Sequence, residues 1–334
     1  MQTDRTIVVN SLDEALAQTL KQLIEDGSKV AISDPLSTAA GRTTYEILNY
    51  SVRVTNPKRR FPGNPEVHFG AVAAVSRFVW MMSASDRASD IAFYQPRAAT
   101  FSDDGLTIPG SSYGRRILSP RPGLNQLAGV IERLKQDPNT RRAFLSIYQP
   151  EDAVRTSRDI PCLLSLGYHI RDGRLHATTY MRANNAYSLF PYNFFEFSLL
   201  AEMIAAELGI EVGPFTHSVA SMHIYEEDID RSRAIVRGSS NTLESPTLEL
   251  PSKPLAGVRG LIALEPLVRA VGHCGAHRLE EVRARADQQL AGVWRDMFQV
   301  LLIHGLLTSN NTLQAKNLIE SIGGPWRRYL SLPA

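Results

Sequence analysis

The sequence predicts an α/β protein in which helices flank a β-sheet. Three observations favour this fold class: a helix followed by a strand at the start, alternating strands joined by an Asp-Gly turn in the middle, and a long apolar helix followed by another strand. The chain has 334 residues, of which 43% are hydrophobic and 21% are charged. This length supports a sizeable core, and the composition excludes disordered and fibrous proteins.

The first elements alternate between helix and strand. Residues 12–26 carry apolar side chains at helical spacing, and Gly27 ends this predicted helix. A short strand is expected over residues 29–33. A polar stretch rich in glycine and threonine, residues 37–44, leads into a strand over residues 44–54 and is a candidate ligand loop.

A largely apolar helix is expected next. Residues 68–82 are mostly small and apolar, which predicts a helix buried on most of its circumference. Arg77 is the only charge in it and therefore stands out. A turn-rich tract, Phe101–Gly114, precedes an amphipathic helix over residues 124–135.

Three strands are expected in the middle of the chain, over residues 142–148, 163–170 and 174–181. The last two are joined through Asp172-Gly173. An Asp-Gly pair between two alternating segments is the strongest short-range signal for a β-hairpin.

A long helix is expected over residues 193–208, between Pro191 and Gly209, and a strand over residues 215–225. This helix is almost entirely apolar. It therefore belongs in the core of the protein.

The last part of the chain carries fewer signals. Residues 239–256 are rich in serine, proline and threonine and form the only plausible loop or linker. Residues 257–334 predict one strand, over residues 259–264, followed by helices. No chemistry can be assigned to this part from its sequence.

Charge and composition exclude several classes of partner. Lys and Arg number 36 against 34 Asp and Glu, so the net charge is only +2 and predicts neither nucleic-acid nor membrane binding. The apolar runs are shorter than the ~20 residues that a membrane span needs. Two cysteines cannot build a disulfide framework, and the polar start MQTDRT lacks the apolar core of a signal peptide. We therefore expect a soluble protein of the reducing cytoplasm.

Cys162 follows a proline at the start of a predicted strand and has two interpretations. A cysteine on a strand is usually a small buried hydrophobic residue. Alternatively it is a nucleophile, because positive groups near a thiol favour the reactive thiolate. Arg158, Arg141 and Arg142 supply such groups if the strands pair.

The second cysteine, Cys274, has His273 and His277 beside it. One cysteine and two histidines are too few for a zinc site and lack its paired spacing. We therefore expect no metal site.

Arginines recur in loops and at strand ends, at Arg42, Arg141, Arg142 and Arg182. Each alone is explained as a surface residue, because arginine prefers solvent. Several that converge would instead bind a phosphate, because the guanidinium fork matches phosphate oxygens and keeps its charge.

Three asparagines, Asn184, Asn185 and Asn193, surround a segment rich in aromatic residues. An amide offers both a donor and an acceptor to the edge of a base. Turn formation explains the first two equally well, and an N-cap role at a helix start explains Asn193.

The motifs RR, PC, YMRANNAYSLFPYN and HIY resemble the thymidylate synthase family in their order and approximate spacing. The resemblance covers residues 40–230 and includes GRTTYEILNYSVRV, Val79-Trp80 and Tyr113-Gly114. The details YQPR, FSDDG and NNAY resemble the branch of pyrimidine nucleotide hydroxymethylases more than the housekeeping thymidylate synthases.

The resemblance implies an α/β fold of the α+β type, with a mixed, bent sheet and flanking helices, as a single domain over residues 1–334. It also implies a homodimer that forms through the sheets and shares its active sites. Such a dimer would cover the sheet face that the alternating strands otherwise leave open.

For the reaction, the resemblance implies that Cys162 adds to C6 of a pyrimidine nucleoside monophosphate and makes C5 a carbon nucleophile. Arg182, with Arg42 as a looser match, would bind the 5′-phosphate. Arg141 and Arg142 would join them from the other subunit.

For the base and sugar, the resemblance implies that Asn193 contacts the pyrimidine edge and that His223 and Tyr225 contact the sugar hydroxyl. Asparagine accepts from N3–H and donates to O4 of uracil, although an amide that turns over serves either base. Ala183 replaces a serine of the family and leaves room for a ribose 2′-hydroxyl.

The cofactor implied by the resemblance is 5,10-methylenetetrahydrofolate, beside Trp80, Ser102, Asp103 and Asn185. Ser102 corresponds to the tryptophan that packs on the folate, and Asn185 corresponds to the pterin-binding aspartate, so both contacts are weakened. Arg77 falls at the position of an essential glutamate. An arginine cannot act as a general base near neutral pH, so the chemistry at this catalytic position is altered.

Three functions follow from these residues. The first is transfer of a one-carbon unit to C5 of UMP, CMP, dUMP or dCMP, with a hydroxymethyl product favoured over a methyl product. The second keeps the addition of Cys162 but drops folate, for exchange, bond cleavage or coupling in a specialised pathway such as that of a nucleoside antibiotic. The third is nucleotide binding without catalysis.

Overall fold

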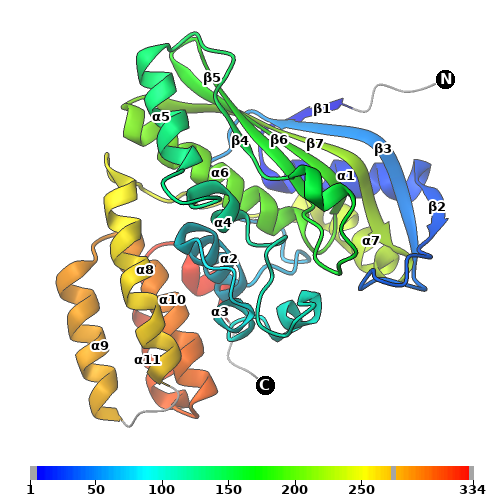
Figure 1. Ribbon diagram of the computed structural model, residues 1–334. Coiled ribbons are helices and arrows are strands. Elements are labelled where there is room, and N and C mark those ends of the chain that lie inside the picture. Colours follow the sequence, from blue (N-terminus) through cyan, green and yellow to red (C-terminus); the bar gives the residue numbers. More distant parts are fainter. Residues whose placement is uncertain (1–5, 272–275, 331–334) are drawn as a thin grey trace.

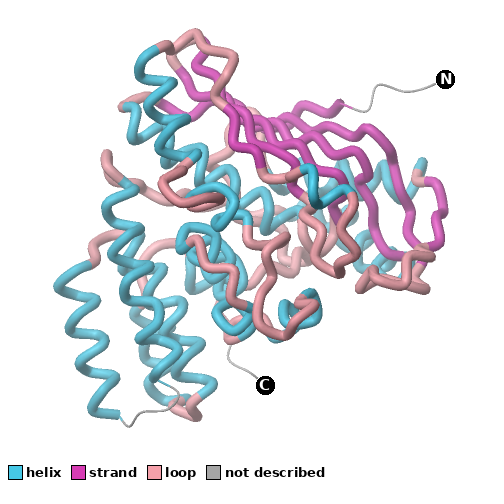
Figure 2. The backbone as a smooth tube through the Cα atoms, viewed as in Figure 1, coloured by secondary structure: helices cyan, strands magenta, loops and turns pink. Residues whose placement is uncertain are grey.

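The computed structural model describes residues 6–271 and 276–330. Its strands form one seven-stranded sheet, and the helices gather on one side of that sheet (Figures 1 and 2). The strands are β1 (Thr6–Val9), β2 (Ser28–Ala31), β3 (Thr43–Val54), β4 (Phe144–Ser146), β5 (Leu163–Arg171), β6 (Arg174–Asn185) and β7 (Glu211–Tyr225). The helices are α1 (Leu12–Asp26), α2 (Ala71–Ser83), α3 (Ala88–Ala92), α4 (Tyr113–Leu118), α5 (Gln126–Gln136), α6 (Phe190–Leu208), α7 (Ile229–Gly238), α8 (Pro254–Val271), α9 (Ala276–Gln289), α10 (Val293–Thr308) and α11 (Thr312–Ser321).

The sheet is mixed, as predicted. Its strand order is β1-β3-β7-β6-β5-β4, with β2 paired to β3. The β1–β3 and β6–β7 pairs are parallel and the other pairs are antiparallel. The β5–β6 hairpin turns at Asp172 (φ 52°) and Gly173 (φ 70°). Two consecutive residues with positive φ are the mark of a type I′ turn, so the Asp-Gly signal is confirmed.

Helix α6 lies beneath β6 and β7 and is the centre of the core. All of its residues from Phe190 to Ala205 are buried, because the sheet covers one side and α2 and α8 contact the other. Burial of an entire circumference explains why this segment is apolar all round. Two carboxylates, Glu196 and Glu202, are exceptions to that pattern, and each is paired with an arginine.

The opposite face of the sheet carries no helix in Figure 1. Large apolar side chains on strands are exposed there, with Leu48 on β3 53% exposed and Tyr180 on β6 41% exposed. Their neighbours along each strand, such as Ile47 and Met181, are buried. This alternation is typical of a sheet with one free face.

Two predictions about the ends of the chain are wrong. Residues 259–264 are not a strand but part of α8, in which Val258, Leu261, Leu264 and Val268 are buried at helical spacing. The helical spacing of the apolar residues is visible only over the whole of Pro254–Val271, not within residues 259–264 alone. Strand β1, which has four residues, was not expected, because so short an alternation carries little signal.

The predicted loop at residues 239–256 begins with one 3₁₀ turn, Ser239–Asn241, and runs irregularly to the start of α8 at Pro254. It is packed rather than loose. The backbone N–H of Leu243 donates to Gly63 O (3.1 Å), and Ser245 Oγ donates to Phe61 O (2.8 Å). A side chain at Gly63 would collide with the Leu243 carbonyl, so glycine is required there.

Within residues 6–271 and 276–330, no helix combines the length and apolar character that a membrane span requires. The same residues contain no group of three histidine, cysteine, aspartate or glutamate side chains placed to hold a metal ion. Cys274 and His273 lie outside the described residues.

Candidate active site

Cys162 lies at the end of the loop that enters β5 and is partly buried. Arg182 on β6 fixes this loop. Its backbone N–H donates to the carbonyl of Cys162 (2.8 Å), and its guanidinium donates to the carbonyls of Ile160 (2.9 Å) and Pro161 (3.0 Å). The exposed Arg182 therefore brings a positive charge beside the cysteine.

A buried carboxylate, Asp159, connects this loop to the start of α4. It accepts from the backbone N–H groups of Gly110 (2.5 Å) and Ser111 (2.8 Å) and from the Ser111 hydroxyl (2.5 Å). A Cβ at Gly110 would collide with the backbone of Asp159, so the two loops touch. This contact fixes the position of the loop that carries Cys162 relative to α4.

Tyr113, the first residue of α4, is brought to Cys162 by these contacts. Burial raises the pKa of its phenol, and the charge on the Cys162 sulfur acts in the same direction. Its neighbour Gly114 contacts the backbone of Met81 on α2 so closely that a side chain would not fit. The sequence marked Tyr113-Gly114 as a motif but gave Tyr113 no role.

Arg77 on α2 pairs with Glu196 on α6 through its Nε. Its Nη2 donates to Asn193 Oδ1 (3.1 Å), and Asn193 Nδ2 faces Met181 Sδ at 3.8 Å. Burial alone would lower the pKa of Arg77, but Glu196 outweighs this effect and raises it, so the guanidinium is charged. Burial raises the pKa of Glu196, against the opposing effect of Arg77.

Asn193 is not the N-cap of α6, because the helix begins three residues earlier, at Phe190. Its side chain is free to meet Arg77. Glu196 was not identified from the sequence. The available signal was an acid among the aromatic residues of an apolar helix, opposite in charge to the single Arg77 of another apolar helix.

Arg42, Tyr225 and His223 converge at the other end of the site. The guanidinium of Arg42 lies 3.4 Å above the ring of Tyr225, and Arg42 Nε donates to Glu227 Oε2 (3.2 Å). Burial raises the pKa of Tyr225, and Cys162 adds to this rise. Burial lowers the pKa of His223, helped by Arg182 and Arg42.

Arg141 and Arg142 are exposed and lie away from Cys162 of the same chain. Strand β4 pairs antiparallel to β5, with Ser146 opposite Ser165 and Phe144 opposite Gly167. The chain before Phe144 is therefore opposite the far end of β5. The expectation that these arginines flank Cys162 within one chain is wrong. Their supply by another subunit stays a prediction.

Asn184 and Asn185 end strand β6, and both are buried. Asn185 Oδ1 accepts from the backbone N–H of Ser188 (2.8 Å), so part of the turn interpretation holds. Asn185 Nδ2 is buried and has no partner among the described residues. Ala183, one position before this pair, lies opposite Ser221 on β7. A buried donor without an acceptor is costly, so Asn185 is a candidate contact for a ligand.

The other positions assigned to the cofactor are occupied by the chain's own turns. Ser102 Oγ lies 2.8 Å from Thr107 O, to which it donates, and Asp103 accepts from the backbone N–H of Arg158 (3.0 Å). Trp80 packs against Ile91 and Ile108. Its Nε1 is buried without a partner among the described residues.

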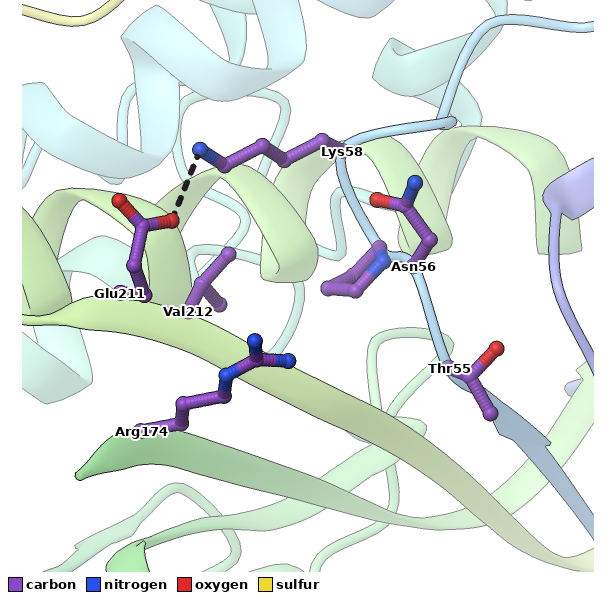
Figure 3. Close-up of a pocket in the computed structure, with 7 residues that line it drawn as sticks. Thr55, Asn56, Lys58, Arg174, Glu211 and Val212 are labelled. Atoms are coloured by element: carbon purple, nitrogen blue, oxygen red, sulfur yellow. Dashed lines mark hydrogen bonds and ion pairs between the residues drawn. The ribbon is translucent and has the colours of Figure 1, made fainter. Parts of the chain in front are cut away.

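A separate pocket of about 270 Å³ lies near the opposite ends of β6 and β7 (Figure 3). It is lined by Thr55, Asn56, Pro57, Lys58, Arg174, Glu211 and Val212. Lys58 Nζ is 3.3 Å from Glu211 Oε2, so these two charges are paired. Arg174 begins β6, whereas Arg182 lies beside Cys162, so this pocket is not part of the cysteine site.

Known proteins share this fold and parts of this sequence. The thymidylate synthase family model matches residues 16–259. A deoxyuridylate hydroxymethyltransferase of Bacillus phage SP01 is 30% identical over 203 residues, which are 56% of this chain and 52% of that protein. A thymidylate synthase of Listeria monocytogenes is 33% identical over 149 residues, which are 43% of this chain and 46% of that protein.

A solved structure, the thermostable thymidylate synthase A from Bacillus subtilis, is similar with a TM-score of 0.61 at 20% identity. The similarity covers 74% of this chain and 91% of that chain, which confirms the predicted fold. The chain spans about half the length of these two relatives. Since the family model covers most of the sequence, the chain belongs to the thymidylate synthase family.

Proposed function

We propose that this protein is a transferase that modifies C5 of a pyrimidine nucleoside 5′-monophosphate after its Cys162 thiolate adds to C6 of the base. The observation that carries this proposal is the position of Cys162, between the cationic groups of Arg182 and Arg42 and the polar cluster around Tyr113 and Arg77. One end suits a phosphate and the other suits a base.

The 5′-phosphate binds to Arg182 and Arg42. Arg42 exchanges its partner Glu227 for the phosphate, and this exchange costs little because the Glu227 side chain is 60% exposed. Arg141 and Arg142 of a second subunit complete the phosphate site. His223 and Tyr225 then lie beside the sugar.

Addition of the thiolate to C6 divides a difficult substitution into easier steps, because it turns C5 into a nucleophile. The phenol of Tyr113 is near enough to the Cys162 sulfur for their charges to interact, so Tyr113 is the proposed group for proton exchange near C5 or C6. The proposed product is a 5-hydroxymethyl nucleotide, by analogy with the phage hydroxymethyltransferase.

The proposed cofactor is 5,10-methylenetetrahydrofolate, which supplies a one-carbon unit at the oxidation level of formaldehyde. Asn185 fits this group at one contact, because its buried Nδ2 lacks an acceptor and the pterin carries a carbonyl oxygen. The Ser102 hydroxyl and the Asp103 carboxylate bond to the chain's own backbone, so we propose that they shape the loop beside the cofactor rather than bind it.

A folate-independent enzyme is the second candidate. The engagement of Ser102 and Asp103 within the chain, together with Arg77 at the position of the family's glutamate, favours it. Here the thiolate still adds to C6, and the activated base undergoes exchange, cleavage or coupling. For either function, we propose that the protein acts in the cytoplasm.

Incubation with UMP, CMP, dUMP and dCMP, with and without the folate, tests the proposal. Mass spectrometry of the products should show a C5 hydroxymethyl adduct on at least one nucleotide only when folate is present. Conversion without folate would favour the second candidate. Calorimetry that shows nucleotide binding with no conversion under either condition would leave only a binding protein.

A further inference from the structure

We infer that Arg77, held by Glu196, makes the site specific for a 4-oxo pyrimidine, uracil rather than cytosine, and stabilises the negative charge that forms on O4. This inference rests on the proposed function, because it takes a pyrimidine as the ligand of Asn193. Arg77 contacts the base and Glu196 is a positioning residue.

The first step is the orientation of the Asn193 amide. Arg77 Nη2 lies 3.1 Å from Asn193 Oδ1, and a guanidinium only donates hydrogen bonds. Were the amide turned over, its NH₂ group would face a second donor. Arg77 therefore fixes the oxygen of Asn193 as the acceptor beside it, and the amide cannot serve both bases.

The second step is the pattern that this pair presents. Asn193 Oδ1 has a second lone pair, and Arg77 Nη1 has no partner among the described residues. The edge of uracil carries a donor at N3–H and an acceptor at O4, which complements this acceptor and donor. Cytosine has an acceptor at N3 and a donor at N4, so both contacts are mismatched.

Arg77 is also accessible to a ligand, unlike another arginine that pairs with α6. A second buried pair, Arg60 with Glu202, also joins an arginine to α6, and its guanidinium is 0% exposed. The Arg77 side chain is 24% exposed, whereas its partner Glu196 is only 3% exposed. Glu196 thus holds Nε from the buried side, and the exposed part of the Arg77 side chain is available to a ligand.

The charge on Arg77 also matches the chemistry. When the Cys162 Sγ–C6 bond forms, the electron pair of the C5=C6 double bond becomes a C4=C5 double bond, and the pair of the C4=O4 double bond moves onto O4. The charge of the thiolate ends on that oxygen, and no proton is transferred. A cationic donor at O4 stabilises this anion, which the 4-amino group of cytosine does not form in the same way.

Calorimetry with UMP and CMP in a Cys162→Ser background separates recognition from chemistry. We expect UMP to bind about a hundredfold more tightly than CMP. In the additional double variant Arg77→Met/Glu196→Leu, which removes both charges, the preference should fall to about tenfold or less. The matched variant Arg60→Met/Glu202→Leu should keep the full preference.

A second variant, Glu196→Gln, covers the case in which the double variant does not fold. It changes one atom and should lower the UMP preference and the rate of C5 tritium release from UMP by about tenfold or more. Equal binding of UMP and CMP, or an unchanged preference in both variants, would overturn the inference. Binding of none of UMP, CMP, dUMP and dCMP would overturn the proposed function itself.

Discussion

At the scale of single residues, Arg182 has two tasks at once. Its guanidinium holds the carbonyls before Cys162 and carries the charge that we assign to the phosphate. Both tasks need the planar fork, which has more donors than the loop uses. Arg171 at the far end of β5 also donates to a backbone carbonyl (2.6 Å to Ile170), but no cysteine lies beside it.

Replacement of Arg182 by Gln should raise the KM for the nucleotide about tenfold to hundredfold, the cost of one charge-assisted contact. Arg171→Gln, the matched control, should leave KM unchanged. Steady-state kinetics with the nucleotide, and with its nucleoside lacking phosphate, provide the measurement. An equal loss with both substrates would show that Arg182 does not act through the phosphate.

Gly114 offers a second test at this scale. A Cβ there would come within 1.6 Å of the Met81 carbonyl oxygen, and neither backbone can move freely. Gly114→Ala should therefore lower Tm by several degrees and displace Tyr113. Gly129→Ala, on the exposed face of α5 with nothing within 4 Å of the new methyl, should instead stabilise by about 1 kcal/mol. Thermal unfolding distinguishes the two, and a Gly114→Ala protein as stable as the parent would contradict the packing argument.

At the scale of elements, His217 joins β7 to β6 on the face of the sheet that α6 covers. Its Nδ1 is 2.7 Å from Thr179 Oγ1 and its Nε2 is 3.1 Å from Asn184 Oδ1. The amide oxygen only accepts, so Nε2 carries the proton and Nδ1 accepts from the threonine. Burial lowers the pKa of His217 to about 3.

This histidine predicts a loss of stability in acid. The unfolded chain binds its proton near pH 6.5, whereas the folded chain does so near pH 3, so the unfolded state holds more protons between these values. The free energy of unfolding should fall by about 1.4 kcal/mol per pH unit as pH drops through this window. NMR titration of the His217 ring, with thermal unfolding of His217→Gln as the control, tests this. A ring that titrates near pH 6.5 would contradict it.

Elements with local signals were predictable, and those fixed by distant contacts were not. The Asp172-Gly173 hairpin follows from two residues, and its φ values agree. The start of α6 and the helical state of residues 259–264 depend on packing between elements, and both were misplaced. Within the candidate site, the resemblance proposed Cys162 and Arg182 from the sequence, whereas the Arg77–Glu196 pair spans 119 positions and needed the fold.

At the scale of the whole molecule, the open face of the sheet exposes apolar side chains that a second subunit would cover. Leu48 and Tyr180 lie exposed on it, and Arg141 and Arg142 have no phosphate site within their own chain. We propose that a homodimer forms through this face. We also propose that the chain is one domain, since α8 packs on α2 and α6 within one core.

Mixing two inactive variants tests the shared site. Cys162→Ser lacks the nucleophile, and Arg141→Gln/Arg142→Gln lacks the proposed phosphate contacts to a partner. Half of the dimers in an equal mixture are mixed, and one site in each is complete, so about a quarter of the parent activity should return. Sedimentation measures the dimer directly. Activity that stays at zero in a mixture of confirmed dimers would show that the arginines do not act across the interface.

Release of tritium from C5 of labelled nucleotide reports the bond between the Cys162 sulfur and C6 of the base. C5 exchanges its hydrogen only after C6 has been attacked. We expect tritium in water with the parent protein and UMP, and none with Cys162→Ser, which still binds the nucleotide. Equal release by both proteins, or no release with any pyrimidine monophosphate in the presence or absence of folate, would contradict it.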